Sequence, residues 1–201
     1  MIHLNGNIMC AIDCETTGTD PTIHCIWQFS CLPLGFDLYP HKSIPPFNIT
    51  LQPWNKNRDP RAVNEKKYIH ATNYGLEQER AANLFDEWFN RLNLGLKKRI
   101  IPLAHNWPFD REFIKFWLTD VGFNYYFDPR YRDTMSLAAT LCDICDANAD
   151  RVPFEAITLH AIATKMGIEW ESGMAHDSTY DAYKTIQIYR RLIHCAQFIY
   201  H

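Results

Sequence analysis

The segment 7–14 (NIMCAIDC) is short and apolar, follows Gly6, and is followed by Thr16-Thr17-Gly18. This pattern predicts a buried strand that ends in a turn. Side chains two residues apart on a strand point to the same face, so Asp13 and Glu15 should project together. Two carboxylates at the end of a buried strand repel each other unless a cation lies between them, and divalent cations prefer oxygen ligands. The pair suggests a metal site, although acids at strand ends also occur without one.

The remaining apolar segments predict an alternation of strands and helices. Residues 24–34 and 47–53 predict two further strands, which with 7–14 would form an antiparallel meander. The helices and the fourth strand are predicted, in chain order, at 76–94 (helix), 99–104 (strand), 108–121, 133–145, 156–166 and from Asp177 to about Tyr200 (helices). Residues 54–72 are polar and basic and predict a loop with at most one helical turn. The order favours an α/β fold with a mixed sheet flanked by helices, and the absence of a linker favours a single domain over residues 1–201.

Composition excludes several classes of protein. The chain has 201 residues, 47% of them hydrophobic, and a net charge of −3, which is typical of a globular domain and not of a broadly basic DNA coat. A bound metal can still supply positive charge for a nucleic-acid substrate. The N-terminus lacks a basic, apolar leader, no apolar run is long enough to span a membrane, and seven cysteines favour reduced thiols. We therefore expect a cytoplasmic protein without a membrane segment.

Two later segments also carry acids beside predicted helix starts. A second motif, His105-Asn106-Trp107-Pro108-Phe109-Asp110, follows the strand at 99–104 and opens a helix. Taken alone, Asp110 could simply cap this helix or interact favourably with its positive N-terminus. His176 and Asp181 are five residues apart. If the last helix begins near Asp177, Asp181 lies in its first turns and His176 lies just before it. The alternative is that Asp177 or Ser178 caps the helix and the histidine is incidental.

Together, the patterns D-x-E-T, N-x-x-F-D and H-x-x-x-x-D resemble the DEDDh group of the DnaQ-like 3′–5′ exonucleases, in the ribonuclease H-like superfamily. The segments 132–138 (RDTMSLA) and 158–168 (TLHAIATKMGI) resemble further parts of that family, so the resemblance covers nearly the whole chain. A sister group has a tyrosine four residues before the last acid. That position is Asp177 here, so the histidine form applies.

The resemblance implies a ribonuclease H-like fold and two divalent ions, Mg²⁺ or Mn²⁺, held by four carboxylates. It assigns these to Asp13, Glu15, Asp110 and Asp181. It makes His176 the general base, a role that suits the ordinary histidine pKa of about 6.5. The product would be a nucleoside 5′-monophosphate.

The resemblance also places the substrate. The segment Thr16-Thr17-Gly18 would face the 3′-terminal nucleotide, and Asn106 would contact the substrate or fix its own loop. Trp107 and Trp27 could stack on bases, but a core position is favoured for both. His105 could rival His176 as the base, but the spacing of the motif favours His176.

The substrate itself stays open. We expect the 3′ ends of DNA, single-stranded or mismatched. Alternatives are an exoribonuclease of the RNase T or oligoribonuclease type, or a nucleic-acid-binding module without catalysis. No residue in the sequence distinguishes deoxyribose from ribose substrates. The sequence also does not identify a polymerase or other replication partner.

Three other signals are given less weight. Cys142 and Cys145 have zinc-like spacing but no second pair, so two cysteines buried on one helix are favoured. The segment 146–150 resembles the start of a calcium loop, but Arg151 replaces the required glycine. The basic residues at 56–67, at 97–99 and at 184, 190 and 191 favour solvated faces over a path for a phosphate backbone.

Overall fold

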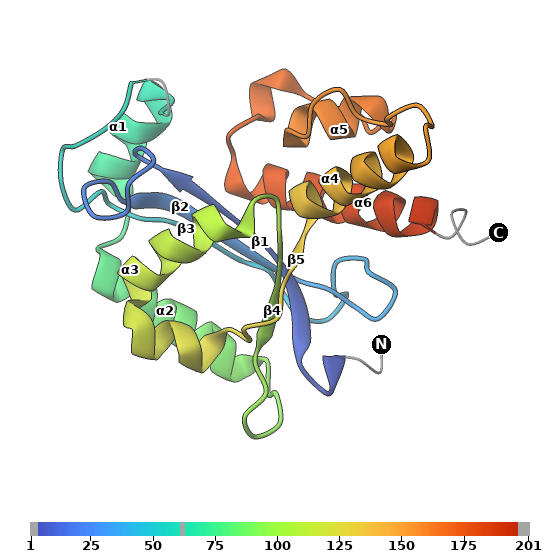
Figure 1. Cartoon of the computed structure of the whole chain (residues 1–201). Coiled ribbons are helices and arrows are strands. Elements are labelled where there is room, and N and C mark those ends of the chain that lie inside the picture. Colours follow the sequence, from blue (N-terminus) through green and yellow to red (C-terminus); the bar gives the residue numbers. More distant parts are fainter. Residues whose placement is uncertain (1–3, 61–62, 197–201) are drawn as a thin grey trace.

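The computed structural model describes residues 4–60 and 63–196, which form a mixed sheet with helices on both faces (Figure 1). The strands are β1 (Ile8–Thr16), β2 (Ile26–Pro33), β3 (Phe47–Thr50), β4 (Ile100–Ala104) and β5 (Arg132–Asp133). The helices are α1 (Glu65–Tyr74), α2 (Gln78–Arg91), α3 (Trp107–Tyr126), α4 (Thr134–Ala147), α5 (Leu159–Lys165), η2 (Ser172–Met174, a 3₁₀ turn) and α6 (Ser178–Ala196).

The strand order is β3-β2-β1-β4-β5, with β1 in the centre. β1 pairs antiparallel with β2, and β2 pairs antiparallel with β3, which confirms the predicted meander. β1 pairs parallel with β4, and β4 with β5. The predicted α/β fold with a mixed sheet is therefore confirmed. The two-residue strand β5 was not predicted, because it directly precedes α4 and is too short to show a period.

The two faces of β1 pack against different helices, because successive side chains on a strand alternate between faces. Cys10 and Ile12 lie in a core with Phe29 and with residues of α2 and α3. Met9 and Ala11 lie in a second core with residues of α6. Asp13 and Glu15 continue the odd-numbered series, so the period of two directs both acids toward the α6 side of the sheet.

The α2–α3 side of the sheet is strongly aromatic. Phe85 of α2 is fully buried and its ring contacts those of Phe29, Phe47 and Trp88. α2 lies within the predicted helix 76–94. Trp107 is buried in the same core, 2% exposed, and the core position predicted for it is confirmed.

Helix α1 corrects the prediction of a loop over 54–72. Asn64 caps this ten-residue helix by accepting hydrogen bonds from the backbone N–H groups of Lys66 and Lys67. Only Tyr68 and Ala71 of the helix are buried, so the apolar stripe is too narrow to produce a clear helical period. The cap and the burial of these two side chains contribute to the stability of the helix.

Several other boundaries also differ from the prediction. The third strand ends at Thr50 and not at 53. The helix predicted at 108–121 continues to Tyr126 across a break at Thr119, whose φ of 61° and ψ of 163° are not helical. The last helix begins at Ser178, close to its predicted start, and the predicted end near Tyr200 lies outside the described residues. Among the described residues, no helix combines the length and hydropathy needed to cross a membrane.

Candidate active site

The C-terminal end of β1 brings one acid from a distant helix next to its own two. β1 pairs with β4 only as far as Ala11, so the backbone N–H of Cys14 has no partner on β4. Asp110, in the first turn of α3, accepts this hydrogen bond through Oδ1 at 3.0 Å and is only 4% exposed. Asp110 is therefore fixed to the backbone between Asp13 and Glu15.

The start of α3 is held by the end of β5. Asn106 has a φ of 70°, in the left-handed region that asparagine tolerates, and its side chain makes no capping hydrogen bond. The N–H of Trp107 donates to Asp133 Oδ2 at 2.5 Å. His105 Nδ1 lies 2.8 Å from the hydroxyl of Thr134, and burial lowers its pKa. His105 is thus tied to the α4 start.

The start of α6 is fixed on β2 by polar contacts. Asp177 caps the helix, because its Oδ1 accepts hydrogen bonds from the N–H groups of Thr179 and Tyr180 at 3.2 Å each. The hydroxyls of Ser30 and Ser178 are 2.7 Å apart and share a hydrogen bond. Gln28, two residues before Ser30 on β2, accepts from the N–H of Ser178 and donates to Asp177 Oδ2. These bonds set the position of Asp181 one turn into the helix.

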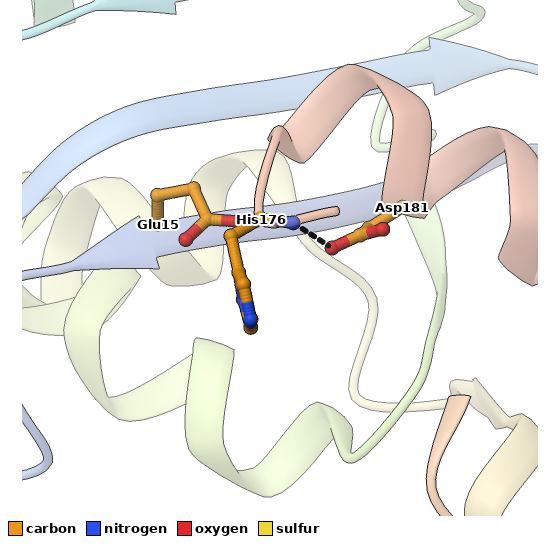
Figure 2. Close-up of side chains that lie close together, drawn as sticks. All are labelled: Glu15, His176 and Asp181. Carbon is orange, nitrogen blue, oxygen red and sulfur yellow. Dashed lines mark hydrogen bonds between the residues drawn. The ribbon is translucent and has the colours of Figure 1, made fainter. Parts of the chain in front are cut away.

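Glu15, His176 and Asp181 meet at this point (Figure 2). One potential ligand atom from each lies within 4.8 Å of those of the other two, although the three residues come from β1, the segment before α6, and α6 itself. The backbone N–H of His176 donates to Asp181 Oδ2 at 3.2 Å, and its imidazole is exposed. Asp13 and Asp110 lie outside this tight group but are close enough to act on its charges.

The carboxylates of the cluster are difficult to ionise without a counter-charge. Burial and then the charge of Asp181 raise the pKa of Glu15 to about 8, while Lys67 opposes the rise. Burial also raises the pKa of Asp110 to about 7 and that of Asp181 to about 6. The pKa of Asp13 is raised well above its usual value, first by burial and then by the charges of Asp110 and Glu15. Burial is thus the main obstacle to ionisation of all four acids, and the charges of the other cluster acids add to it at Asp13 and Glu15.

The donor set fits a divalent cation. Asp181 Oδ1 is buried and has no hydrogen-bond partner among the described residues. A buried carboxylate oxygen without a partner is unfavourable, and a cation supplies what is missing. Carboxylate oxygens with one imidazole suit Mg²⁺, Mn²⁺ or Zn²⁺. A candidate metal site therefore exists at the end of β1.

The turn after β1 is tightly packed. The hydroxyl of Thr16 donates to the carbonyl of Gly18 at 2.7 Å, and Thr17 Oγ1 accepts from the N–H of Cys25 at 3.0 Å. Gly18 does not have a positive φ, and a Cβ there would lie 2.4 Å from Nε2 of His24, so the His24 ring would have to shift. Trp27 is buried, as predicted, and its indole N–H donates to the carbonyl of Thr16.

Two contributors to the site were not predicted. Gln28 lies opposite Glu15 in the β1–β2 register, and the alternation along β2 could have indicated it. Lys67 belongs to α1, which was predicted as loop, and no local pattern places it near residue 176.

A family model and several solved structures match this chain. A family model named RNase_T, described as an exonuclease, matches residues 10–189, from β1 to α6. Escherichia coli exonuclease I in complex with a dT13 oligonucleotide superimposes with a TM-score of 0.68 at 21% identity, covering 92% of this chain and 41% of that one. Exonuclease I from Methylocaldum szegediense gives a TM-score of 0.69 at 20% identity, covering 93% and 40%.

A third similar structure is cell-death related nuclease 4, with a TM-score of 0.69 at 13% identity, covering 94% of this chain and 64% of that one. The chain thus spans about two fifths of the exonuclease I chains that it matches. At these identities the structures show a shared fold, and the family model shows the relationship. The chain belongs to the RNase_T exonuclease family of DnaQ-like proteins, as its three acidic motifs predicted.

Proposed function

We propose that this chain is a metal-dependent exonuclease that removes nucleotides one at a time from the 3′ ends of DNA. The observation that carries the proposal is the buried acid cluster at the end of β1, with its unpartnered Asp181 Oδ1 and the imidazole of His176 beside it. Membership in an exonuclease family supports the reaction class, and the cluster supports the site.

In this proposal Asp13, Glu15, Asp110 and Asp181 hold the cations, which we take to be two Mg²⁺ or Mn²⁺. The chemistry that such ions supply is stabilisation of negative charge on the attacking and leaving oxygens of a phosphodiester. Asp110 is held by the N–H of Cys14, and Asp181 by the N–H of His176, so both carboxylates are fixed before substrate arrives. Prepositioning of this kind reduces reorganisation during the reaction.

His176 is the proposed general base. Its exposed imidazole lies beside Glu15 and Asp181 and can accept a proton from the attacking water. In-line attack on the last phosphodiester would release a nucleoside 5′-monophosphate. Thr16, Thr17 and Gly18 would line the place of the terminal nucleotide, and Asn106, whose amide is not used as a helix cap, would bind the substrate.

DNA is preferred over RNA because the similar exonuclease I structures contain a dT13 oligonucleotide or single-stranded DNA. The name of the family model keeps RNA as the second candidate. The two polymers differ at the 2′-hydroxyl, so a direct comparison on matched sequences decides between them.

The test uses the wild type and Asp181→Ala, with Mg²⁺, with Mn²⁺, and with chelator. Matched DNA and RNA strands carry a label at the 5′ end. Asp143→Ala serves as a control, because Asp143 is an exposed acid on α4. We expect a ladder that shortens from the 3′ end, present in the wild type and the control and absent in Asp181→Ala.

The same gel contains the contrary outcomes. Immediate release of the label as a mononucleotide would indicate the opposite polarity. Faster degradation of the RNA strand would show that RNA, and not DNA, is the preferred substrate. No cleavage of either strand, with Mn²⁺ binding shown by calorimetry, would contradict the proposed exonuclease activity and favour a nucleic-acid-binding module.

A further inference from the structure

The ammonium group of Lys67 reaches from α1 to the segment that carries His176. Nζ donates a hydrogen bond to the backbone carbonyl of His176 at 2.6 Å and lies 3.9 Å from Asp177 Oδ2. The Lys67 side chain is 30% exposed, so it is partly shielded from solvent. No other contact between α1 and this segment is as direct among the described residues.

The segment before α6 needs such support. His176 has a φ of 59°, a left-handed conformation that is unfavourable for a residue with a Cβ. Residues 171–174 are exposed, and so is the imidazole itself, so packing does not fix the histidine. Its backbone is held by two hydrogen bonds: the N–H donates to Asp181 Oδ2, and the carbonyl accepts from Lys67.

Lys67 is itself well positioned. Asn64 accepts a hydrogen bond from its backbone N–H, and Tyr68, the next residue, is buried. The guanidinium of Arg58 lies over the Tyr68 ring at 4.7 Å and pairs with Glu65 at 3.0 Å. The first turn of α1 is therefore anchored on both sides of the lysine.

We propose that Lys67 is a positioning residue that holds His176 over the Glu15–Asp181 cluster by its hydrogen bond to the His176 carbonyl. The inference rests on the proposed function, because it assigns the general base to His176. It adds that α1, a helix with few core contacts, controls the placement of that base. Loss of the bond should let the backbone of residue 176 leave its left-handed conformation and move the imidazole away from the cluster.

The kinetic test compares Lys67→Met and Lys67→Arg with Lys66→Met. Lys66 is the exposed neighbour on the same helix and makes the same change in charge. We expect kcat of Lys67→Met to fall roughly 10- to 100-fold, as small displacements of catalytic groups do. KM should stay within about twofold, Lys67→Arg should recover most of the activity because it can donate to the same carbonyl, and Lys66→Met should match the wild type.

Mn²⁺ affinity separates positioning from damage to the site. Lys67→Met removes a positive charge near Glu15 and Asp181 and should leave Mn²⁺ binding unchanged or tighter, as measured by calorimetry. Weaker Mn²⁺ binding would overturn the proposal, since it would mean that the cluster itself had collapsed. Unchanged kcat with a raised KM and a shallower salt dependence would also overturn it, and would make Lys67 a phosphate contact instead.

A second measurement does not depend on turnover. Mn²⁺ broadens the nuclear magnetic resonance signals of nearby protons, and the signal of His176 can be assigned among the nine histidines by its loss in His176→Gln. We expect strong broadening of the His176 imidazole in the wild type and in Lys66→Met, and clearly less in Lys67→Met. Equal broadening in all three would refute the positioning role, whereas inactivity of the wild type alone would refute only the proposed function.

Discussion

Replacing Asp181 by asparagine should stabilise the metal-free protein at pH 8. Burial raises the pKa of Asp181 from an ordinary value of 3.8 to about 6, and the neighbouring His176 only partly opposes this. The unfolded chain therefore releases this proton at a lower pH than the folded protein does. The contribution of Asp181 to stability is therefore fully present below about pH 4 and is lost as the pH rises through about 6.

The size of this destabilisation follows from the difference between the pKa values of Asp181 in the folded and unfolded chain. About 2 pH units at 1.36 kcal/mol per unit give about 3 kcal/mol of destabilisation above pH 6. The asparagine carries no charge, and its amide oxygen can still accept the hydrogen bond from the N–H of His176. For a chain of this length, about 3 kcal/mol corresponds to a rise in Tm of roughly 6–12 °C.

The assay is thermal unfolding in chelator at pH 4 and at pH 8, with the exposed Asp143→Asn as control. We expect the Asp181→Asn variant to exceed the wild type at pH 8 and to match it at pH 4. Mn²⁺ at 1,000 times its Kd should reverse the order, because it stabilises the wild type by about 4.1 kcal/mol and the variant lacks one ligand. A variant that is less stable than the wild type at pH 8 in chelator, or equally displaced at both pH values, would refute the reasoning.

Three further substitutions test other parts of the structure. His176→Gln should lower kcat by about 10²- to 10⁴-fold with Mn²⁺ affinity largely kept, and calorimetry showing a loss of binding would make the histidine a ligand instead of the base. Ser30→Ala removes the partner of the buried Ser178 hydroxyl at the start of α6 and should cost about 1–3 kcal/mol, measured by urea unfolding. Phe85→Ala leaves a cavity among the aromatic side chains under the sheet and should cost about 3–5 kcal/mol, while kcat per folded molecule stays unchanged in activity assays.

Local patterns predicted most of the framework because they depend on neighbouring residues only. The period of two in β1 placed Asp13 and Glu15 on one face, and the helix start near Asp177 put Asp181 one turn inside α6. α1 was missed for the opposite reason. Its cap at Asn64 is a local signal, but the helix buries only two side chains, and its stability depends on contacts that are distant in sequence.

The candidate site shows the same division. Its acids and histidine were named from the sequence, yet nothing local states that the carboxylate of Asp110 binds the backbone of Cys14, or that Asp181 Oδ1 is left without a partner. The raised pKa values of Glu15 and Asp110 also need the fold, because burial is a property of what surrounds a group.

By itself, the sequence determined which residues are candidates for the chemistry and on which face of each element they lie, because side-chain direction follows the short periods of strand and helix. Only the tertiary structure decided that Lys67 reaches the carbonyl of His176, and that the acids share one desolvated site. Contacts between residues far apart in the chain depend on how the sheet and its helices pack together, and no local period encodes that packing.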